Sequence, residues 1–312
     1  MLTRRQLRIK AMQALYANRV TGSSLQKAIN TLEDSLDNVY QLFLMEMKAL
    51  GEFHRFEEER FERGKKKKMP SPEDLVPNLA MLDNPLLKKL RFDSNLIALF
   101  DEHSVRWGDD RDMLNTVYKK MIAGEEYQEY VALTNPTEEQ QRHFVMEMYS
   151  IYFAHNEVLH ELYEERNIHW SDDLEAAQMM VVYALKESSL NELEPLTLPT
   201  LYKDKEDLDF TLDLLRKSIQ NEDYFEELIA AQTKNWESDR IAVVDKLLMK
   251  MALAELIYFT QIPVKVTFNE YIELTKLFST SRSGTFINGV LDKLVAQLTE
   301  SKQIRKVGRG LL

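Results

Sequence analysis

The chain has 312 residues, a formal net charge of −11 at pH 7 and no cysteine. Its length is that of about two ordinary domains and is enough for a large hydrophobic core. The lack of cysteine excludes disulfide scaffolds, thiolate nucleophiles and cysteine-based zinc sites. The acidity argues against a protein that coats nucleic acid with its whole surface.

Apolar residues recur mostly at helical spacing and alternating runs are scarce, so the sequence predicts an all-α fold. Only 9 glycines and 8 prolines occur, which disfavours long flexible segments. No apolar run approaches the ~20 residues that span a bilayer, and the start of the chain lacks a signal-peptide core. We therefore expect a soluble cytoplasmic protein that does not contact the membrane.

The first helix is expected from Thr3 to about Arg19 and carries a basic cluster. No acidic residue occurs before Glu33. Arginine near a helix start opposes the helix macrodipole, so its presence here indicates a contact such as phosphate. A simply solvated helix start is the alternative. The residues of this helix that we assign to its polar face or to phosphate contact are Arg4, Arg5, Arg8, Lys10 and Gln13.

A turn at residues 21–24 is followed by a long helix that begins at Leu25 and runs through Met47. Residues 53–63 are dense in aromatic and acidic side chains, and the segment from Gly64 to Pro72 breaks the pattern. Four consecutive lysines occupy residues 65–68 of that segment. A charge run beside Pro-Ser-Pro indicates a solvated loop, with a phosphate grip as the alternative.

The middle of the chain predicts further helices without a clue to their task. They are expected near residues 86–90, 96–100, 113–122, 138–154, 158–166 and 174–186. Glu157 and His160 form one Glu-x-x-His motif, but a helical-bundle di-iron site needs two such motifs, so we predict no metal site. A proline-punctuated connection follows at residues 193–199.

Residues 235–294 are predicted to form three helices with short connections. The first, residues 241–258, is apolar on more than one face and should be largely buried, with Ser238 or Asp239 as its cap and Trp236 as a packing anchor. Thr267 and Glu270 match a capping box, which predicts that the second helix starts there.

The third helix of this stretch is predicted through Asn288-Gly289, although that dipeptide is a strong hairpin signal. The apolar residues Phe286, Val290 and Leu294 follow at helical spacing, and no alternating pattern flanks the pair. A glycine inside a helix costs about 1 kcal/mol relative to alanine, so Gly289 is expected to let another backbone approach closely.

Short motifs recur in a fixed order near the carboxyl terminus and in the first helix. They are NWESDR at 235–240, ALAEL at 252–256, IPVK at 262–265, NEYIELTK at 269–276, FINGVLDK at 286–293, and RRQLR and AMQALY at 4–8 and 11–16. In this order they resemble the family of the transcription antitermination factor NusB. The resemblance extends over about sixty residues near the carboxyl terminus and returns in the first helix. It is absent from most of the chain between, and it is expected to re-enter after residue 199.

The resemblance implies two helical-bundle subdomains of NusB type, with the amino-terminal half enlarged by inserted helices. We expect an amino-terminal helix of the NusB-like unit at residues 1–34, an inserted helical region at 35–200, a NusB-like helical domain at 201–301 and a basic tail at 302–312. The tail carries Lys302, Arg305, Lys306 and Arg309 without a counter-charge.

The resemblance also implies the partners. NusB-family proteins bind the single-stranded boxA element of ribosomal RNA leaders together with the ribosomal protein NusE, and reach other Nus factors and RNA polymerase indirectly. The residues expected to bind RNA are Arg4, Arg5, Arg8, Lys10, Gln13, Arg282, Phe286 and Asn288. Those expected to bind the partner protein are Tyr16, Glu255 and Tyr258.

One departure from the family pattern lies in this site. The family usually has an acidic residue and a lysine shortly before the aromatic residue, where this chain has Arg282 and Thr285. Phe286 itself is expected either to stack on a base or to fill the junction between subdomains.

No nucleophile, glycine-rich phosphate loop, zinc spacing or cofactor motif stands out, so we predict no catalytic residue, no cofactor and no enzymatic activity. The function expected is an RNA-binding antitermination factor in which separate ends of the chain form a cationic groove for unpaired RNA. The alternative is a non-enzymatic helical scaffold that binds a basic ribosomal protein without RNA contact.

Overall fold

The computed structural model describes residues 1–233 and 241–311. Every regular element in these residues is helical, which confirms the predicted all-α class. The chain divides into two compact units: unit 1 comprises Met1 and residues 37–201, and unit 2 comprises residues 2–36 and 202–312. Within the described residues, no helix combines the length and the apolar composition that a membrane crossing requires.

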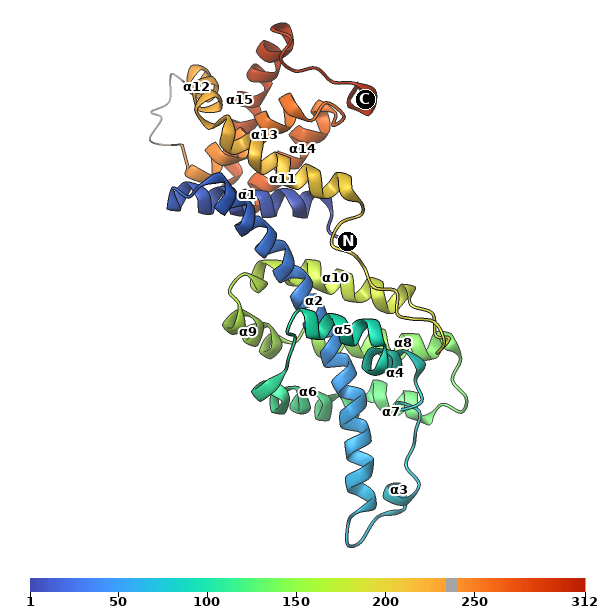
Figure 1. Ribbon diagram of the computed structural model, residues 1–312. Coiled ribbons are helices and arrows are strands. Elements are labelled where there is room, and N and C mark those ends of the chain that lie inside the picture. The colour runs from blue at the N-terminus through green and yellow to red at the C-terminus, as the bar shows by residue number, and fades with distance from the viewer. Residues whose placement is uncertain (234–240, 312) are drawn as a thin grey trace. The chain divides into compact units, whose positions relative to one another are not determined.

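The longest element is α2, Leu25–Lys65, a single helix of 41 residues whose larger part belongs to unit 1 (Figure 1). The other elements of unit 1 are α3 (Pro72–Leu75), α4 (Pro85–Phe92), α5 (Ser94–Glu102), η1 (Gly108–Asp110), α6 (Arg111–Ala123), α7 (Glu125–Ala132), α8 (Glu138–Tyr149), η2 (Ser150–Ala154), α9 (Glu157–Arg166) and α10 (Trp170–Glu187).

The core of unit 1 surrounds the middle of α2, where every residue from 42 to 47 is buried. The ring of Phe53 lies 4.8 Å from that of Phe153 and 5.6 Å from that of Tyr118, centroid to centroid. At Gly51, an added Cβ would lie 2.8 Å from the carbonyl oxygen of Leu90 in α4. The glycine therefore lets the two helices approach closely.

Two carboxyl groups of α2 are fully buried in this core. Glu46 accepts a hydrogen bond of 2.5 Å from the Tyr149 hydroxyl. Burial raises the pKa of the Glu46 carboxyl group to about 7, although the hydrogen bonds from Tyr149 and Gln178 act to lower it. Glu57 instead pairs with Arg60 at 2.6 Å.

Unit 2 contains the first helix and the carboxyl-terminal third of the chain. Its helix α13 contacts each of the five other α-helices that the described residues form wholly within this unit (Figure 1). The elements are α1 (Arg4–Thr21), α11 (Lys205–Gln220), α12 (Glu222–Gln232), α13 (Val243–Tyr258), α14 (Val264–Phe278), α15 (Ser281–Glu300) and η4 (Gly308–Leu311).

The central position of α13 follows from its apolar circumference. Every residue from Leu247 to Leu256 is buried, as the sequence predicted for this helix. The charged residues in this run are paired, since Lys250 donates to Glu222 at 2.8 Å and to Glu226 at 2.9 Å. The expected cap at Ser238 or Asp239 and the packing role of Trp236 lie outside the described residues.

The predicted start of α14 at Thr267 is wrong. The helix begins at Val264 with Pro263 as its N-cap, so Thr267 already lies inside the helix. Its side chain is fully buried and its hydroxyl donates a 2.8 Å hydrogen bond to Glu255. The sequence has the local pattern of a capping box, but the Thr267 hydroxyl bonds a side chain of another helix instead of capping α14.

Helix α15 continues through Asn288 and Gly289, which confirms the prediction of a helix rather than a hairpin there. The explanation given for Gly289 is wrong. An added Cβ at this position would meet no atom within 4 Å, and the residue is exposed. No close backbone approach among the described residues therefore requires this glycine.

Candidate nucleic-acid interface

The basic start of α1 is ordered by a capping box. The Thr3 hydroxyl accepts from the backbone N–H of Gln6 at 3.3 Å, and the Gln6 side chain accepts from the backbone N–H of Thr3 at 2.7 Å. Reciprocal bonds of this kind satisfy two of the unpaired donors at a helix start. They fix the point at which the arginine-rich turns begin.

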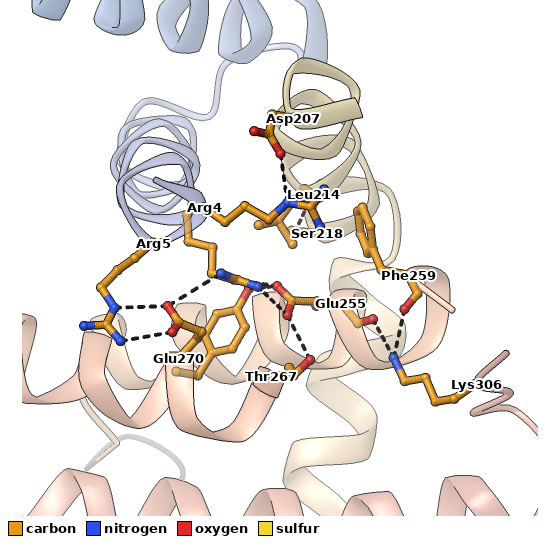
Figure 2. A network of polar contacts seen from close by, with 12 residues as sticks. Arg4, Arg5, Asp207, Leu214, Ser218, Glu255, Phe259, Thr267, Glu270 and Lys306 are labelled. Carbon is orange, nitrogen blue, oxygen red and sulfur yellow. Dashed lines mark hydrogen bonds and ion pairs between the residues drawn. The ribbon is translucent and has the colours of Figure 1, made fainter. Parts of the chain in front are cut away.

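Arg8 forms a buried ion pair with Glu255 of α13. Its Nε and Nη2 donate to the two carboxylate oxygens at 2.7 and 2.8 Å. The side chains are only 2% and 0% exposed. Thr267 and Tyr271 donate further hydrogen bonds to the same carboxylate, at 2.8 and 3.4 Å (Figure 2 shows Glu255 beside Thr267). The fully bonded carboxylate joins α1, α13 and α14.

The prediction that Arg8 projects from the first helix is therefore wrong. Burial disfavours the charged guanidinium, but hydrogen bonds and the charge of Glu255 outweigh it, so the pKa of Arg8 is raised. Lys10 is also buried, at 5% exposed, and makes contacts within the protein. The two buried side chains lie two residues apart and therefore on different sides of α1, so this part of the helix is covered by protein on more than one side.

Arg4 and Arg5 remain partly exposed, at 36% and 44% of their side chains. Arg4 pairs with Asp207 at 2.9 Å and with Glu206 at 2.8 Å. Arg5 donates from Nε and Nη2 to Glu270, both at 3.0 Å (Figure 2). Although burial lowers the pKa of Arg4, its two acidic partners raise it by more.

The ion pairs of Arg4 and Arg5 change the expected picture of a free cationic groove. Both guanidinium groups neutralise carboxylates of unit 2. Each uses Nε and Nη2 in these bonds, and within the described residues the Nη1 of neither takes part in a hydrogen bond. A guanidinium can hold a carboxylate through one edge and offer the other edge to a phosphate.

The start of α15 presents the second group of predicted residues. Thr280 caps the helix by accepting from the backbone N–H of Ser283 at 3.2 Å. Arg282 is exposed, and the half-buried Phe286, which makes contacts within the protein, lies one turn later on the same side. Asn288 is exposed but lies on the other flank of the helix, and its amide donates to Asp292 at 3.2 Å.

The three residues expected to bind a protein partner do not share one environment. Tyr16 and Tyr258 are 44% and 39% exposed. The Tyr258 hydroxyl donates to Asn221 at 2.8 Å. Glu255 is fully buried beneath its hydrogen bonds, so it serves the fold and is removed from the partner surface. Gln13 is half-buried and makes contacts within the protein.

The basic tail does not extend freely from unit 2. Ile304 is buried, and an added Cβ at Gly310 would lie 2.0 Å from the carbonyl oxygen of Thr260. Lys306 donates to the carbonyl oxygens of Glu255 and Phe259 at 3.3 and 3.0 Å (Figure 2). It thereby caps the end of α13, and its burial lowers its pKa to about 8.

No group of three or more His, Asp or Glu side chains in the described part of the chain is placed to hold a metal ion. What the surface offers is hydrogen-bond donors on Arg4, Arg5 and Arg282 and an aromatic ring at Phe286. These groups suit contacts to phosphates and to an unpaired base.

Comparison with known proteins identifies the family. The family model described as "NusB family" matches residues 173–296. A relative named "Transcription antitermination protein NusB" from Salinibacter ruber is 39% identical over 120 residues, which cover 38% of this chain and 75% of the relative. The chain belongs to the NusB family.

A second relative of the same name, from Chloroherpeton thalassium, is 33% identical over 138 residues, or 44% of this chain and 65% of the relative. No solved structure matches the chain significantly. The NusB match begins at residue 173, inside α10, which is earlier in the chain than residue 199, after which the sequence analysis expected the family pattern to re-enter.

The carboxylates that hold the arginines were missed by reasoning from the sequence. Asp207 and Glu270 are 203 and 265 residues from their arginine partners. Acidic residues are common throughout this chain, so nothing local distinguishes these two. The tertiary fold selects them, since α1 packs against α11 and α13 and its Arg5 reaches Glu270 of α14.

Proposed function

We propose that this NusB-family protein is a transcription antitermination factor that binds boxA-like single-stranded RNA of ribosomal RNA leaders together with the ribosomal protein NusE. The observation that carries the proposal is the 39% identity to an antitermination protein over 75% of that relative's length. The partly exposed arginines at the start of α1 add physical support, because phosphate binding requires accessible cations.

The proposed contacts divide into two kinds. Arg4 and Arg5 donate from Nη1 to RNA phosphates while their carboxylate partners hold them in place. Arg282 supplies a third cation, and Phe286 offers a ring edge or face to an unpaired base. Lys10, Gln13 and Asn288 stay in the proposed neighbourhood of the RNA, but they are not needed for the phosphate contacts.

Arg8 has a different part in this proposal. Its side chain is 2% exposed and pairs with Glu255 at 2.7 Å and with Glu270 at 3.6 Å, so it acts as a positioning residue. It holds the first turns of α1 against α13, and this fixes the place of Arg4 and Arg5. Tyr16 and Tyr258 remain the proposed contacts for NusE. The activity proposed is binding alone, without catalysis or a cofactor.

The test is a titration of the full chain against boxA-like single-stranded RNA and a scrambled RNA of the same composition, each with and without NusE. We expect preference for the boxA-like RNA and tighter binding when NusE is present. Equal affinity for both RNAs in both conditions would refute the proposal. In the alternative, a protein scaffold, the chain would bind NusE without RNA, and boxA-like RNA would add no affinity.

A further inference from the structure

The carboxyl end of α2 carries a cationic surface that the NusB match does not include, since that match begins at residue 173. We call residues 63–76 the α2 tip. Lysines occupy residues 65–68, and all four are exposed. The protein as a whole has a net charge of −11, so this concentration of positive charge is a local feature of an acidic molecule.

The side chain of Asp74 holds the α2 tip together. It accepts from the Nζ of Lys67 at 2.8 Å and from the backbone N–H of Ser71 at 2.8 Å. It also lies against Gly64, where an added Cβ would meet its Oδ1 at 2.6 Å. Ser71 and Asp74 form the capping box of the short helix α3. These contacts connect the end of α2 to the start of α3 and stabilise the turn between them.

This arrangement leaves Lys66 and Lys68 exposed, and no ion pair is formed by either lysine among the described residues. Lys65 pairs with Glu62 at 3.0 Å, and Lys67 pairs with Asp74. Among the residues that the structure describes, no hydrogen bond or ion pair links Lys66 or Lys68 to another side chain. Paired and unpaired lysines alternate, so the tip keeps its shape while two ammonium groups stay available.

We propose that the α2 tip binds the phosphate backbone of RNA that flanks the boxA-like element, a role that rests on the proposed function. Lysine ammonium groups on an ordered turn suit phosphate as point charges. Residues 62–91 contain no aromatic side chain, so the tip lacks the platform on which bases stack. The contact is therefore electrostatic and independent of RNA sequence.

The lack of aromatic side chains also argues against a lipid surface as the occupant of the tip. Met69 and Val76 are 90% and 82% exposed, which gives the tip some apolar area. Interfacial membrane segments, however, present aromatic and apolar residues along one face of an amphipathic helix, and α3 has only 4 residues. Flanking RNA is therefore the occupant that the tip fits.

The test compares two RNAs. One is the boxA-like element alone, and the other carries additional single-stranded flanking sequence on both sides of that element. The variant is Lys66→Gln/Lys68→Gln, which keeps the Asp74 contacts. The control is Lys119→Gln/Lys120→Gln, which removes the same charge from two exposed neighbours in α6.

On the extended RNA, the tip variant should flatten the dependence of log K on log salt by about 1.4, or about 0.7 for each lost phosphate contact. The short RNA should be bound equally by wild type, variant and control. Equal slopes for wild type and tip variant on the extended RNA would overturn this proposal alone. Failure of the wild type to bind either RNA would overturn the proposed function and this proposal together.

Vesicles of phosphatidylserine serve as a second probe. If the wild type binds them and the tip variant does not, while both bind the extended RNA alike, the tip is a lipid-binding element and the proposal is refuted. Vesicle binding that is absent, or equal in wild type and variant, together with the flatter slope on RNA, supports it.

Discussion

Replacement of Arg8 by alanine should destabilise unit 2 strongly. The change would leave the Glu255 carboxylate fully buried without the guanidinium that pairs with it, while Thr267 and Tyr271 still donate to it. Breaking a buried pair in this way costs about 3–5 kcal/mol. The matched control is Arg5→Ala, since Arg5 also makes two bonds to one carboxylate but is 44% exposed. A surface pair of that kind contributes about 0–1 kcal/mol.

Hydrogen exchange read by mass spectrometry on peptides of α1 and α13 measures this effect within unit 2 itself. Since 1.36 kcal/mol corresponds to a factor of ten, Arg8→Ala should speed exchange there by roughly 10²- to 10⁴-fold. Arg5→Ala should change it by less than about fivefold. If Arg8→Ala exchanged no faster than Arg5→Ala, the pair would not hold α1 in place and the reasoning would be refuted.

Two further predictions concern stability. Because the pKa of Glu46 is raised to about 7 from 4.5, the folded state binds its proton more tightly than the unfolded state, so the free energy of unfolding should fall by up to about 3 kcal/mol as pH rises from 4.5 past 7. Glu46→Gln should remove that fall in urea titrations followed by tryptophan fluorescence, and a variant that keeps it would contradict the assignment. Gly51→Ala should cost about 1–3 kcal/mol because its Cβ meets the Leu90 carbonyl, whereas Gly289→Ala should stabilise by about 1 kcal/mol. Similar thermal midpoints for Gly51→Ala and Gly289→Ala would contradict the prediction that the first variant is destabilised and the second stabilised.

Much of the fold could be predicted because helical periodicity is local. The apolar circumference of residues 241–258 predicted a buried helix, and α13 is the central helix of unit 2. The start of α14 was misplaced at Thr267, because a capping pattern cannot reveal that its hydroxyl bonds a carboxylate of another helix. Local signals set helices, whereas tertiary partners decide how polar side chains are used.

The candidate site could be predicted only in part for the same reason. The sequence singled out the arginines of α1, but the burial of Arg8 depends on Glu255, which lies 247 residues away. When polar residues occur on all sides of the first turns of a helix, the sequence alone does not indicate which of them will face the core. Arg4 and Arg5 stay at the surface, and Arg8, one turn later, does not.

The dependence of RNA affinity on salt tests the central claim most directly. With phosphate contacts from Arg4, Arg5 and Arg282, log K for boxA-like single-stranded RNA should fall with log salt at a slope of about −2. Arg4→Ala/Arg5→Ala should flatten that slope by about 1.4, whereas Lys119→Gln/Lys120→Gln should leave it unchanged. A slope in Arg4→Ala/Arg5→Ala equal to that of the wild type would contradict the claim that the start of α1 holds the RNA backbone.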